Sequence, residues 1–348
     1  MTNPINVGLI GFGMAGQVFH APLIHANPHL RLTHIVQRRG GQSQERYPQA
    51  KVVRDVNAVL GDPSISLVVI ATPNTTHFEL AAQALEAGKH VVVDKPFTIT
   101  SADADQLIAL SRTVNRVLSV FQNRRWDGDF LTVRRILDQK LLGRVAEFES
   151  RYDRFRPALK PGAWREQDLP GSGVLFDLGA HLIDQAVILF GRPAAVSADV
   201  RRQRDSAAVV DSFDVRLEYP DLKVSVKAGL LVCAPSPRFV LYGTEGSYLK
   251  FGLDPQEEAL KRGAMPDQNN WGEESEDSWG THSRCLGSVV REKYPTLPGC
   301  YSEYYINVYR VILGQAELAV KPEQAREVIG LIELAQQSAL EKRTIPLA

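Results

Sequence analysis

The sequence predicts an α/β protein with two domains, and two observations support this fold class. The chain has 348 residues, which is more than one hydrophobic core usually serves, since such cores stop growing at ~250–300 residues. Short apolar runs alternate with helical patterns over the first third, whereas longer and closely spaced strand patterns follow. We therefore expect one domain over residues 1–121 and a second over residues 122–348.

The first domain is expected to contain a parallel sheet. Apolar runs rich in β-branched residues predict strands at residues 7–10, 30–36, 51–53, 67–70, 90–93 and 117–120. Helical patterns between them predict helices at residues 15–26, 77–87 and 101–114. Strands and helices that alternate in this way form right-handed crossovers between parallel strands.

The second domain is expected to be α+β, with a large open and mostly antiparallel sheet. Strands are predicted at residues 144–153, 195–202, 212–219, 223–231, 238–242 and 248–251, and helices at 128–139, 178–190, 301–313 and 323–341. Short turns between the strands favour antiparallel pairing, with helices on one face. Residues 254–298 are polar and irregular, so we expect them to form a long surface excursion.

The composition argues against several classes of protein and site. Lys and Arg total 40 and Asp and Glu total 40, a balance that attracts neither nucleic acid nor an anionic membrane. No apolar run reaches the ~18 residues of a membrane span. Three cysteines without close pairing argue against a disulfide framework and against a zinc site. We expect a cytoplasmic protein without a metal, a nucleic-acid partner or a membrane partner.

A glycine-rich loop follows the first predicted strand and consists of Gly11, Phe12, Gly13, Met14, Ala15 and Gly16. In this G-x-G-x-x-G pattern the first glycine permits a tight turn and the second lets the backbone approach a pyrophosphate. The third allows the helix to pack closely. The helix N-terminus adds N–H donors and a positive dipole. The loop therefore predicts a Rossmann domain that binds a dinucleotide, rather than a purely structural turn.

The end of the second predicted strand bears on which dinucleotide binds. NAD enzymes usually place an Asp or Glu here for the ribose hydroxyls, but this sequence has Gln37, Arg38 and Arg39. A carboxylate would repel a 2′-phosphate, whereas arginine can bind it in a bidentate manner. We predict a preference for NADP. The alternative is that the two arginines are solvated loop charges and that NAD serves equally.

Asp94, Lys95 and Pro96 follow the strand predicted at residues 90–93. The carboxyl ends of parallel strands face the ligand crevice, where a lysine can polarise a carbonyl or stabilise an alkoxide. Position alone also allows a surface lysine before a helix.

Asp177 and His181 are four residues apart, so they share one face of a helix. A histidine is the usual base for a hydroxyl proton, and a nearby carboxylate could orient it. The residues alone slightly favour the alternative of a helix-start acid beside a satisfied core histidine. A metal site is a third interpretation, which no other clustered ligand supports.

Together these segments resemble the glucose–fructose oxidoreductase/inositol dehydrogenase/MocA family over essentially the whole chain. The glycine loop, residues 71–77, residues 94–96 and residues 177–181 occur in the family's order and at its spacing. The resemblance implies that Lys95 and His181 are catalytic, with Asp177 beside them. It also implies a cis peptide bond before Pro96. The family often has Glu where Asp94 stands, so the carboxylate here reaches one methylene less far.

The resemblance further implies the cofactor and substrate contacts. Beyond the glycine loop and residues 37–39, the cofactor residues are Thr72, Pro73, Asn74, His77, Asp94, Lys95, Asn123, Trp164 and Arg165. The substrate residues are Asn123, Arg125, Lys95, Asp177 and His181. For Arg124 and Arg125, ion pairing between domains is an equal alternative.

The implied activity is hydride transfer between NADP(H) and a secondary alcohol or ketone of a polyol or sugar, as in the NADP-dependent scyllo-inositol dehydrogenase branch. Three alternatives remain: a reductase of another sugar-like carbonyl, a glycosidase that retains its nicotinamide, and a sensor of cofactor state without catalysis. We expect a homo-oligomer, dimer or tetramer, formed through the open sheet.

Overall fold

The computed structural model describes residues 4–160, 162, 166–285 and 288–347. The chain forms two compact units, and each is assembled from separate stretches of sequence. The first unit comprises Met1–Trp126, Pro255–Trp271 and Cys300–Glu327, and the second comprises Asp127–Asp254, Gly272–Gly299 and Val328–Ala348. Two segments from the last third of the chain therefore return to the first unit.

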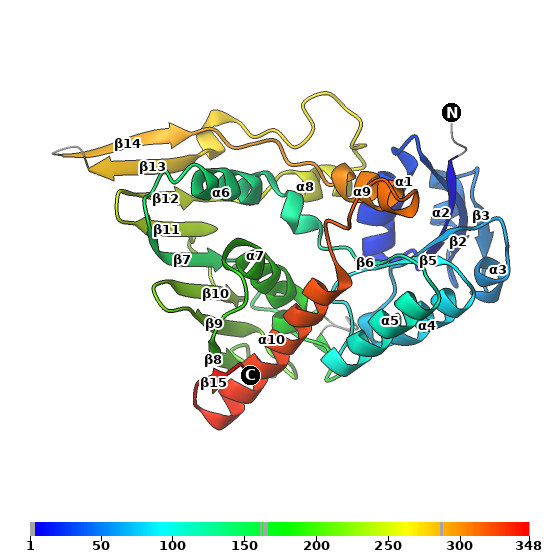
Figure 1. Ribbon diagram of the computed structural model, residues 1–348, viewed down its shortest axis with the longest axis horizontal. Helices are drawn as coiled ribbons and strands as arrows, with labels where there is room; N and C mark the ends of the chain where they lie inside the picture. Colours follow the sequence, from blue (N-terminus) through cyan, green and yellow to red (C-terminus); the bar gives the residue numbers. More distant parts are fainter. Residues whose placement is uncertain (1–3, 161, 163–165, 286–287, 348) are drawn as a thin grey trace. The chain divides into compact units, whose positions relative to one another are not determined.

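The first unit contains a six-stranded sheet in the order β3-β2-β1-β4-β5-β6, and all neighbours pair in parallel. The strands are β1 (Ile5–Ile10), β2 (Leu30–Val36), β3 (Lys51–Val53), β4 (Leu67–Ile70), β5 (His90–Val93) and β6 (Leu118–Val120). The chain runs outward in one direction from β1 to β3 and in the other from β4 to β6. Right-handed crossovers then place helices on both faces (Figure 1), which confirms the predicted parallel sheet.

The helices of the first unit differ in how well the sequence predicted them. They are α1 (Ala21–His25), α2 (Gln42–Arg46), α3 (Asn57–Leu60), α4 (His77–Glu86), α5 (Ser101–Thr113), α8 (Gln256–Lys261) and α9 (Ser302–Ile312). Helices α4 and α5 pack against each other (Figure 1), and both begin at their predicted residues. The helix predicted over residues 15–26 is present as continuous helical residues 14–25, and its middle is a π-helical segment, η1 (Gly16–His20), that leads into α1.

The second unit contains a nine-stranded sheet in the order β14-β13-β12-β11-β7-β10-β9-β8-β15 (Figure 1). Its strands are β7 (Val145–Arg151), β8 (Ala195–Arg201), β9 (Ser212–Glu218), β10 (Lys223–Gly229), β11 (Phe239–Gly243), β12 (Gly246–Lys250), β13 (Gly280–Cys285), β14 (Val289–Tyr294) and β15 (Ile345–Pro346). Strands β7 and β10 pair in parallel and the other neighbours are antiparallel. The sheet is thus mostly antiparallel, as predicted.

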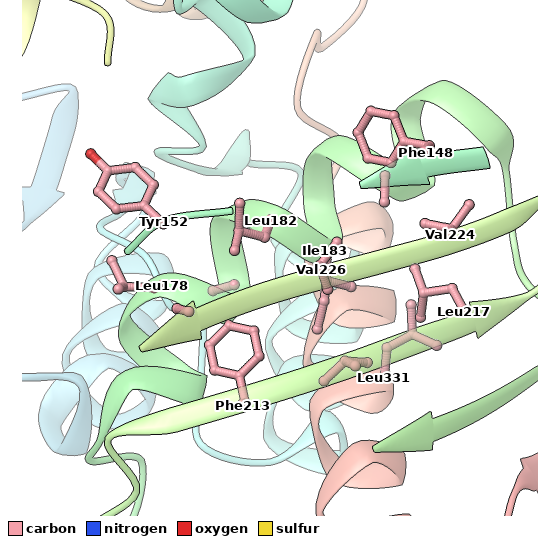
Figure 2. Packing of buried hydrophobic residues seen from close by; sticks show 14 of the residues in the cluster. Phe148, Tyr152, Leu178, Leu182, Ile183, Phe213, Leu217, Val224, Val226 and Leu331 are labelled. Atoms are coloured by element: carbon pink, nitrogen blue, oxygen red, sulfur yellow. The ribbon is translucent and has the colours of Figure 1, made fainter. Parts of the chain in front are cut away.

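Helices α6 (Gly128–Asp138), α7 (Ala180–Phe190) and α10 (Pro322–Glu341) supply side chains to the core of this unit. Figure 2 shows Leu182 and Ile183 of α7 against Val226 of β10, with Phe213 of β9 below them. These strand residues alternate with charged ones, because successive side chains of a strand point to opposite faces. One face of the sheet therefore carries the helices and the core.

The other face carries charged side chains in rows. Lys227 of β10 lies 2.8 Å from Glu149 of β7 and 3.4 Å from Asp214 of β9. Lys223 lies 2.8 Å from Glu147 on the same two central strands. Acidic and basic residues thus face each other across neighbouring strands, which stabilises their pairing in register.

The prediction that residues 254–298 form an irregular surface excursion is wrong. This stretch contains α8, which belongs to the first unit, and the strands β13 and β14, which extend the large sheet. Both strands are polar, with burial that alternates along β13 and exposure along β14. Strand β14 is the edge strand and β13 is its neighbour, and neither contains a long apolar run.

Candidate functional site

The carboxyl ends of the parallel strands bring the predicted site residues of the first unit to one edge of the sheet. Strands β1, β2, β4, β5 and β6 end at Ile10, Val36, Ile70, Val93 and Val120. The residues that follow are the glycine loop, Gln37, the 71–77 segment, Asp94 and the 121–126 segment. In open α/β sheets, ligands bind at this edge.

The three glycines of the loop are glycines for different structural reasons. Gly11 has a φ of +101°, and a Cβ on it would lie 2.6 Å from the carbonyl oxygen of Ala71. A Cβ on Gly16 would lie 2.3 Å from the carbonyl oxygen of Gly11. A Cβ on Gly13 would meet nothing within 4 Å, and Gly13 is exposed. The protein's own packing therefore requires Gly11 and Gly16, while the missing side chain at Gly13 leaves space for a ligand such as a pyrophosphate.

The π-helical turn after the loop ends at His20. The sequence did not indicate that this histidine belongs to the site. His20 is fully buried. Its Nδ1 atom lies 2.7 Å from the hydroxyl of Tyr305 in α9, and its Nε2 atom lies 3.5 Å from Oδ1 of Asp94. π-Helical turns often occur at functional sites. A histidine within a helical pattern gives no signal that it will reach the end of another strand.

At the end of β2, an amide occupies the position of the usual acid. Gln37 is buried, and its side-chain oxygen accepts a hydrogen bond from the hydroxyl of Ser43. Nη1 of Arg54 donates to the carbonyl oxygens of Gln37, at 3.2 Å, and of Arg38. Arg38 and Arg39 are exposed. Ser43 and Arg54 thus hold the backbone from which the two guanidinium groups project, and the sequence analysis identified neither.

The segment after β4 forms a short 3-10 helix, η2 (Asn74–Thr76), that leads into α4. The hydroxyls of Thr72 and Thr76 lie 2.7 Å apart, and that of Thr76 donates to the carbonyl of Pro73 at 2.8 Å. Asn74 is buried. His77 is 1% exposed and its ring lies among backbone carbonyls. The segment is therefore ordered by its own side chains.

The segment after β5 has the predicted cis peptide bond between Lys95 and Pro96. Lys95 is partly exposed, whereas Asp94 is buried. Burial alone would raise the pKa of Asp94, but the hydrogen bond and charge of His20 and the charges of Lys95 and His77 lower it below the usual value. Asp94 is therefore a carboxylate next to Lys95. The carboxylate of Asp94, one methylene shorter than that of the Glu that the family often has here, lies 3.5 Å from Nε2 of His20.

The 121–126 segment contains the 3-10 helix η3 (Asn123–Trp126), in which Asn123, Arg124 and Arg125 are buried. Nη1 of Arg125 donates to the carbonyl of Ala319 at 2.8 Å and to Oε1 of Gln324 at 2.9 Å. These contacts give Arg125 a structural role within the first unit. Its role toward a substrate remains a prediction.

Arg124 forms an ion pair with Glu257 at the start of α8, and this pair lies within the first unit. Burial alone would raise the pKa of Glu257, but Arg124 and Lys261 lower it to about 2. The neighbouring Gln256 donates to the carbonyl of Trp126 at 3.1 Å and accepts from the backbone N–H of Tyr301 at 2.8 Å. The returning segment 255–271 therefore fixes η3.

Asp177 and His181 lie in the second unit, at the start of α7. A π-helical turn, η5 (Leu175–Gly179), precedes that helix and contains Asp177. Asp177 is partly exposed, and His181 is 3% exposed. Gly173, before the turn, has a φ of +83°, and a Cβ there would lie 2.7 Å from the carbonyl of Val210. The predicted helix thus starts earlier and with a wider turn than the sequence suggested.

The other predicted site residues are divided between the two units or lie outside the described part of the chain. Trp164 and Arg165 lie outside the described residues. Lys95 belongs to the first unit, and Asp177 and His181 belong to the second. Among the residues that the structure describes, no group of three or more His, Cys, Asp or Glu could hold a metal ion. Of the helices described, none is long and apolar enough to cross a membrane.

Two family models match the chain. The model of the "Oxidoreductase family, NAD-binding Rossmann fold" matches residues 5–122, and that of the "Oxidoreductase family, C-terminal alpha/beta domain" matches residues 134–347. Both are models of the Gfo/Idh/MocA family. Together they cover most of both units.

Individual proteins are similar over the full length. The uncharacterized oxidoreductase YdgJ of Escherichia coli is 46% identical, with 100% of each chain covered. The scyllo-inositol 2-dehydrogenase (NADP(+)) IolW of Bacillus subtilis is 37% identical, with 99% of this chain and 96% of that protein covered. The solved structure of YvaA from Bacillus subtilis has a TM-score of 0.96 and 36% identity, and 99% of each chain is covered.

Proposed function

Because the chain belongs to the Gfo/Idh/MocA oxidoreductase family and has its NAD-binding Rossmann domain, we propose that it is an NADP-preferring dehydrogenase. Its substrate is a secondary alcohol or ketone of a polyol or sugar, of the inositol type. The observation that carries the cofactor preference is the end of β2, where Gln37 replaces the usual acid and Arg38 and Arg39 are exposed. A 2′-phosphate would find two guanidinium groups there and no carboxylate among these three residues.

The glycine loop would hold the pyrophosphate, since only Gly13 is free of packing constraints from the protein itself. The nicotinamide cofactor supplies the hydride chemistry when bound. The further residues proposed to contact it are Thr72, Pro73, Asn74, Asp94, Lys95, Asn123, Trp164 and Arg165. His77 belongs to the same segment, and its ring faces the backbone carbonyls of Thr72 and Pro96.

Lys95 and His181 carry the proton chemistry in this proposal. His181 takes the proton of the reacting hydroxyl during oxidation and returns it to the oxygen during reduction. The Lys95 ammonium donates a hydrogen bond to the same oxygen and stabilises the negative charge that develops on it. Asp177 orients His181 or accepts a hydrogen bond from another hydroxyl of the substrate. The carboxylate of Asp94 lies beside Lys95, whose charge helps to lower the pKa of that carboxyl.

The inositol assignment draws on IolW, a scyllo-inositol 2-dehydrogenase (NADP(+)) that is 37% identical over nearly the whole chain. A panel of inositols and aldoses, each assayed with NADP and with NAD, tests the proposal through the formation of reduced cofactor. We expect turnover of an inositol with NADP and a lower KM for NADP than for NAD. A clear preference for NAD would overturn the cofactor assignment.

The same panel separates the alternatives. Turnover of a different sugar-like carbonyl with NADPH would indicate another reductase. Hydrolysis of a glycoside, with the cofactor retained and no net change in its absorbance, would indicate a glycosidase. Cofactor binding without turnover of any polyol would favour a sensor.

The charged face of the nine-stranded sheet is the surface that we propose for a homo-oligomer, dimer or tetramer. Its rows of acidic and basic residues, such as Lys227 between Glu149 and Asp214, could pair with the same rows on a second copy. Light scattering during gel filtration tests this, and a monomer at micromolar concentration would overturn it.

A further inference from the structure

The imidazole ring of His77 spans two loops that follow neighbouring strands. Its Nδ1 atom lies 2.9 Å from the carbonyl oxygen of Pro96, and its Nε2 atom lies 3.0 Å from the carbonyl oxygen of Thr72. Thr72 follows β4 and Pro96 follows β5, and these strands are paired in parallel. One side chain therefore connects the loop predicted to bind the cofactor with the loop that carries Lys95.

The protonation of the ring decides which loop it holds. Carbonyl oxygens only accept hydrogen bonds, so a ring nitrogen must carry a proton to bind either one. Burial lowers the pKa of His77, and the opposing effects of Asp94 and of the carbonyls of Pro96 and Thr72 leave a net decrease. A neutral ring donates to one carbonyl at a time. Each neutral tautomer donates a hydrogen bond to one of the two loops, and a protonated ring would donate to both.

The two backbone contacts lie directly beside groups assigned to function. Pro96 is the residue after Lys95, so a hydrogen bond to its carbonyl restrains the backbone from which the lysine side chain projects. Thr72 begins the segment with Pro73 and Asn74, which is proposed to contact the cofactor. Because His77 is only 1% exposed, it acts through these backbones more readily than by direct contact with a ligand.

Asp94 restrains the same loop from the other end. Its carboxylate lies 3.5 Å from Nε2 of His20, and its charge acts on His77 as well as on Lys95. Lys95 is therefore flanked by a residue held through its side chain and a residue held through its carbonyl.

We propose that His77 is a positioning residue that couples the cofactor-binding loop after β4 to the loop of Lys95 after β5. The inference rests on the proposed role of Lys95. An imidazole suits this task because its two nitrogens point in different directions, so one ring can face a carbonyl on each side. The contact to Pro96 affects turnover, and the contact to Thr72 affects cofactor affinity.

Two substitutions separate the contacts. In His77→Asn the amide nitrogen can replace Nδ1 and donate to Pro96, and in His77→Gln it can replace Nε2 and donate to Thr72. One lost hydrogen bond changes an equilibrium or a rate by roughly 3- to 10-fold. We expect His77→Asn to raise the KM for NADP by about this factor with kcat retained. We expect His77→Gln to lower kcat by about this factor with KM retained.

The separate effects of the two variants can also be measured without any substrate. Fluorescence titration gives the Kd for NADPH, and acetic anhydride labelling followed by mass spectrometry gives the reactivity of Lys95. Only His77→Asn should weaken NADPH binding, and only His77→Gln should change the labelling rate of Lys95. Gln83→Ala, on the exposed side of the same helix, is the matched control and should change neither.

The outcomes are distinguishable from failure of the proposed function. If the wild-type protein turns over no polyol, the dehydrogenase assignment fails, while binding and labelling still test His77. Equal losses in both readouts for the two variants, as in general destabilisation, would overturn the positioning role. Unchanged readouts in both variants would overturn it as well. Either variant alone is informative if only one of them folds.

Discussion

The two sheets of this protein carry their candidate functional residues in different ways. In the parallel sheet of the first unit, the residues follow the ends of several strands, because parallel strands all finish at one edge. In the mixed sheet of the second unit, the candidates Asp177 and His181 lie on a π-turn and a helix that pack against the sheet. Strand ends can be located from apolar runs, whereas a site on a helix needs a motif to be recognised.

The comparison also separates structural from functional requirements. The loop after β1 contains two glycines that the fold needs and one that it does not need. In the first unit, the glycines required by packing are therefore different residues from the glycine that leaves room for a ligand. In the second unit the charged rows of the sheet face pair across neighbouring strands, which stabilises the sheet itself.

The largest expected effect tests whether each unit contributes to the chemistry. Lys95→Ala and His181→Ala should each lower kcat by ~10²- to 10⁴-fold, the usual contribution of a positioned proton-transfer or charge-stabilising group. The affinity for NADPH, measured by fluorescence titration, should stay nearly unchanged. Near-normal turnover in one variant would assign the chemistry to the other unit alone.

The next largest effect is expected from substitutions that distinguish the roles of the loop glycines. Gly13→Ala should raise the Kd for NADPH by roughly 10- to 100-fold, because the added methyl group enters the space proposed for the pyrophosphate. The melting temperature should stay the same, since a Cβ at Gly13 meets no protein atom within 4 Å.

Gly16→Ala is the contrasting variant, because its Cβ would lie 2.3 Å from the carbonyl oxygen of Gly11. It should lower the free energy of unfolding by ~1–3 kcal/mol through overpacking. Denaturant unfolding checks this. A stable Gly16→Ala protein, or a destabilised Gly13→Ala protein, would contradict the division of roles.

A smaller effect concerns the edge of the sheet at β2. Arg38→Ala should raise the KM for NADP by about 10-fold, the value of one charge-assisted hydrogen bond, and leave the KM for NAD unchanged. Arg31→Ala is a suitable control, because Arg31 is an exposed arginine near the beginning of the same strand. Parallel losses with both cofactors would show that Arg38 does not read the 2′-phosphate.

The smallest effect is a pH dependence of the first unit. Nδ1 of His90 accepts a hydrogen bond from the backbone N–H of Val117 at 3.0 Å. Burial, with the charge of Arg116, lowers the pKa of His90 from 6.5 to about 4. The unfolded chain therefore binds a proton first as the pH falls, and the free energy of unfolding decreases between about pH 6.5 and pH 4.

We expect this decrease to amount to ~1–2 kcal/mol, because the side chain is partly exposed and solvent screens part of the shift. His90→Asn keeps an oxygen that can accept from Val117 and removes the titration. Urea unfolding at several pH values should show a shallower decrease for the variant. Equal pH profiles would show that His90 does not contribute.

The sequence alone determined the parallel sheet closely. The bounds of β2, β3, β4 and β5 coincide with the predicted ranges. Strand β4 is apolar and buried at every position, as expected for a strand that helices cover on both faces. The glycine loop and the cis bond at Lys95–Pro96 were also predicted, the first from its spacing and the second from the family resemblance.

Tertiary structure decided what the pattern could not. The polar strands β13 and β14 form one end of the large sheet, and the parallel pairing of β7 with β10 joins strands far apart in the sequence. His20, Ser43, Arg54 and Glu257 support site residues from 16 or more positions away or from a neighbouring turn. Local sequence encodes backbone preference and burial, whereas these contacts depend on which distant segments the folded chain brings together.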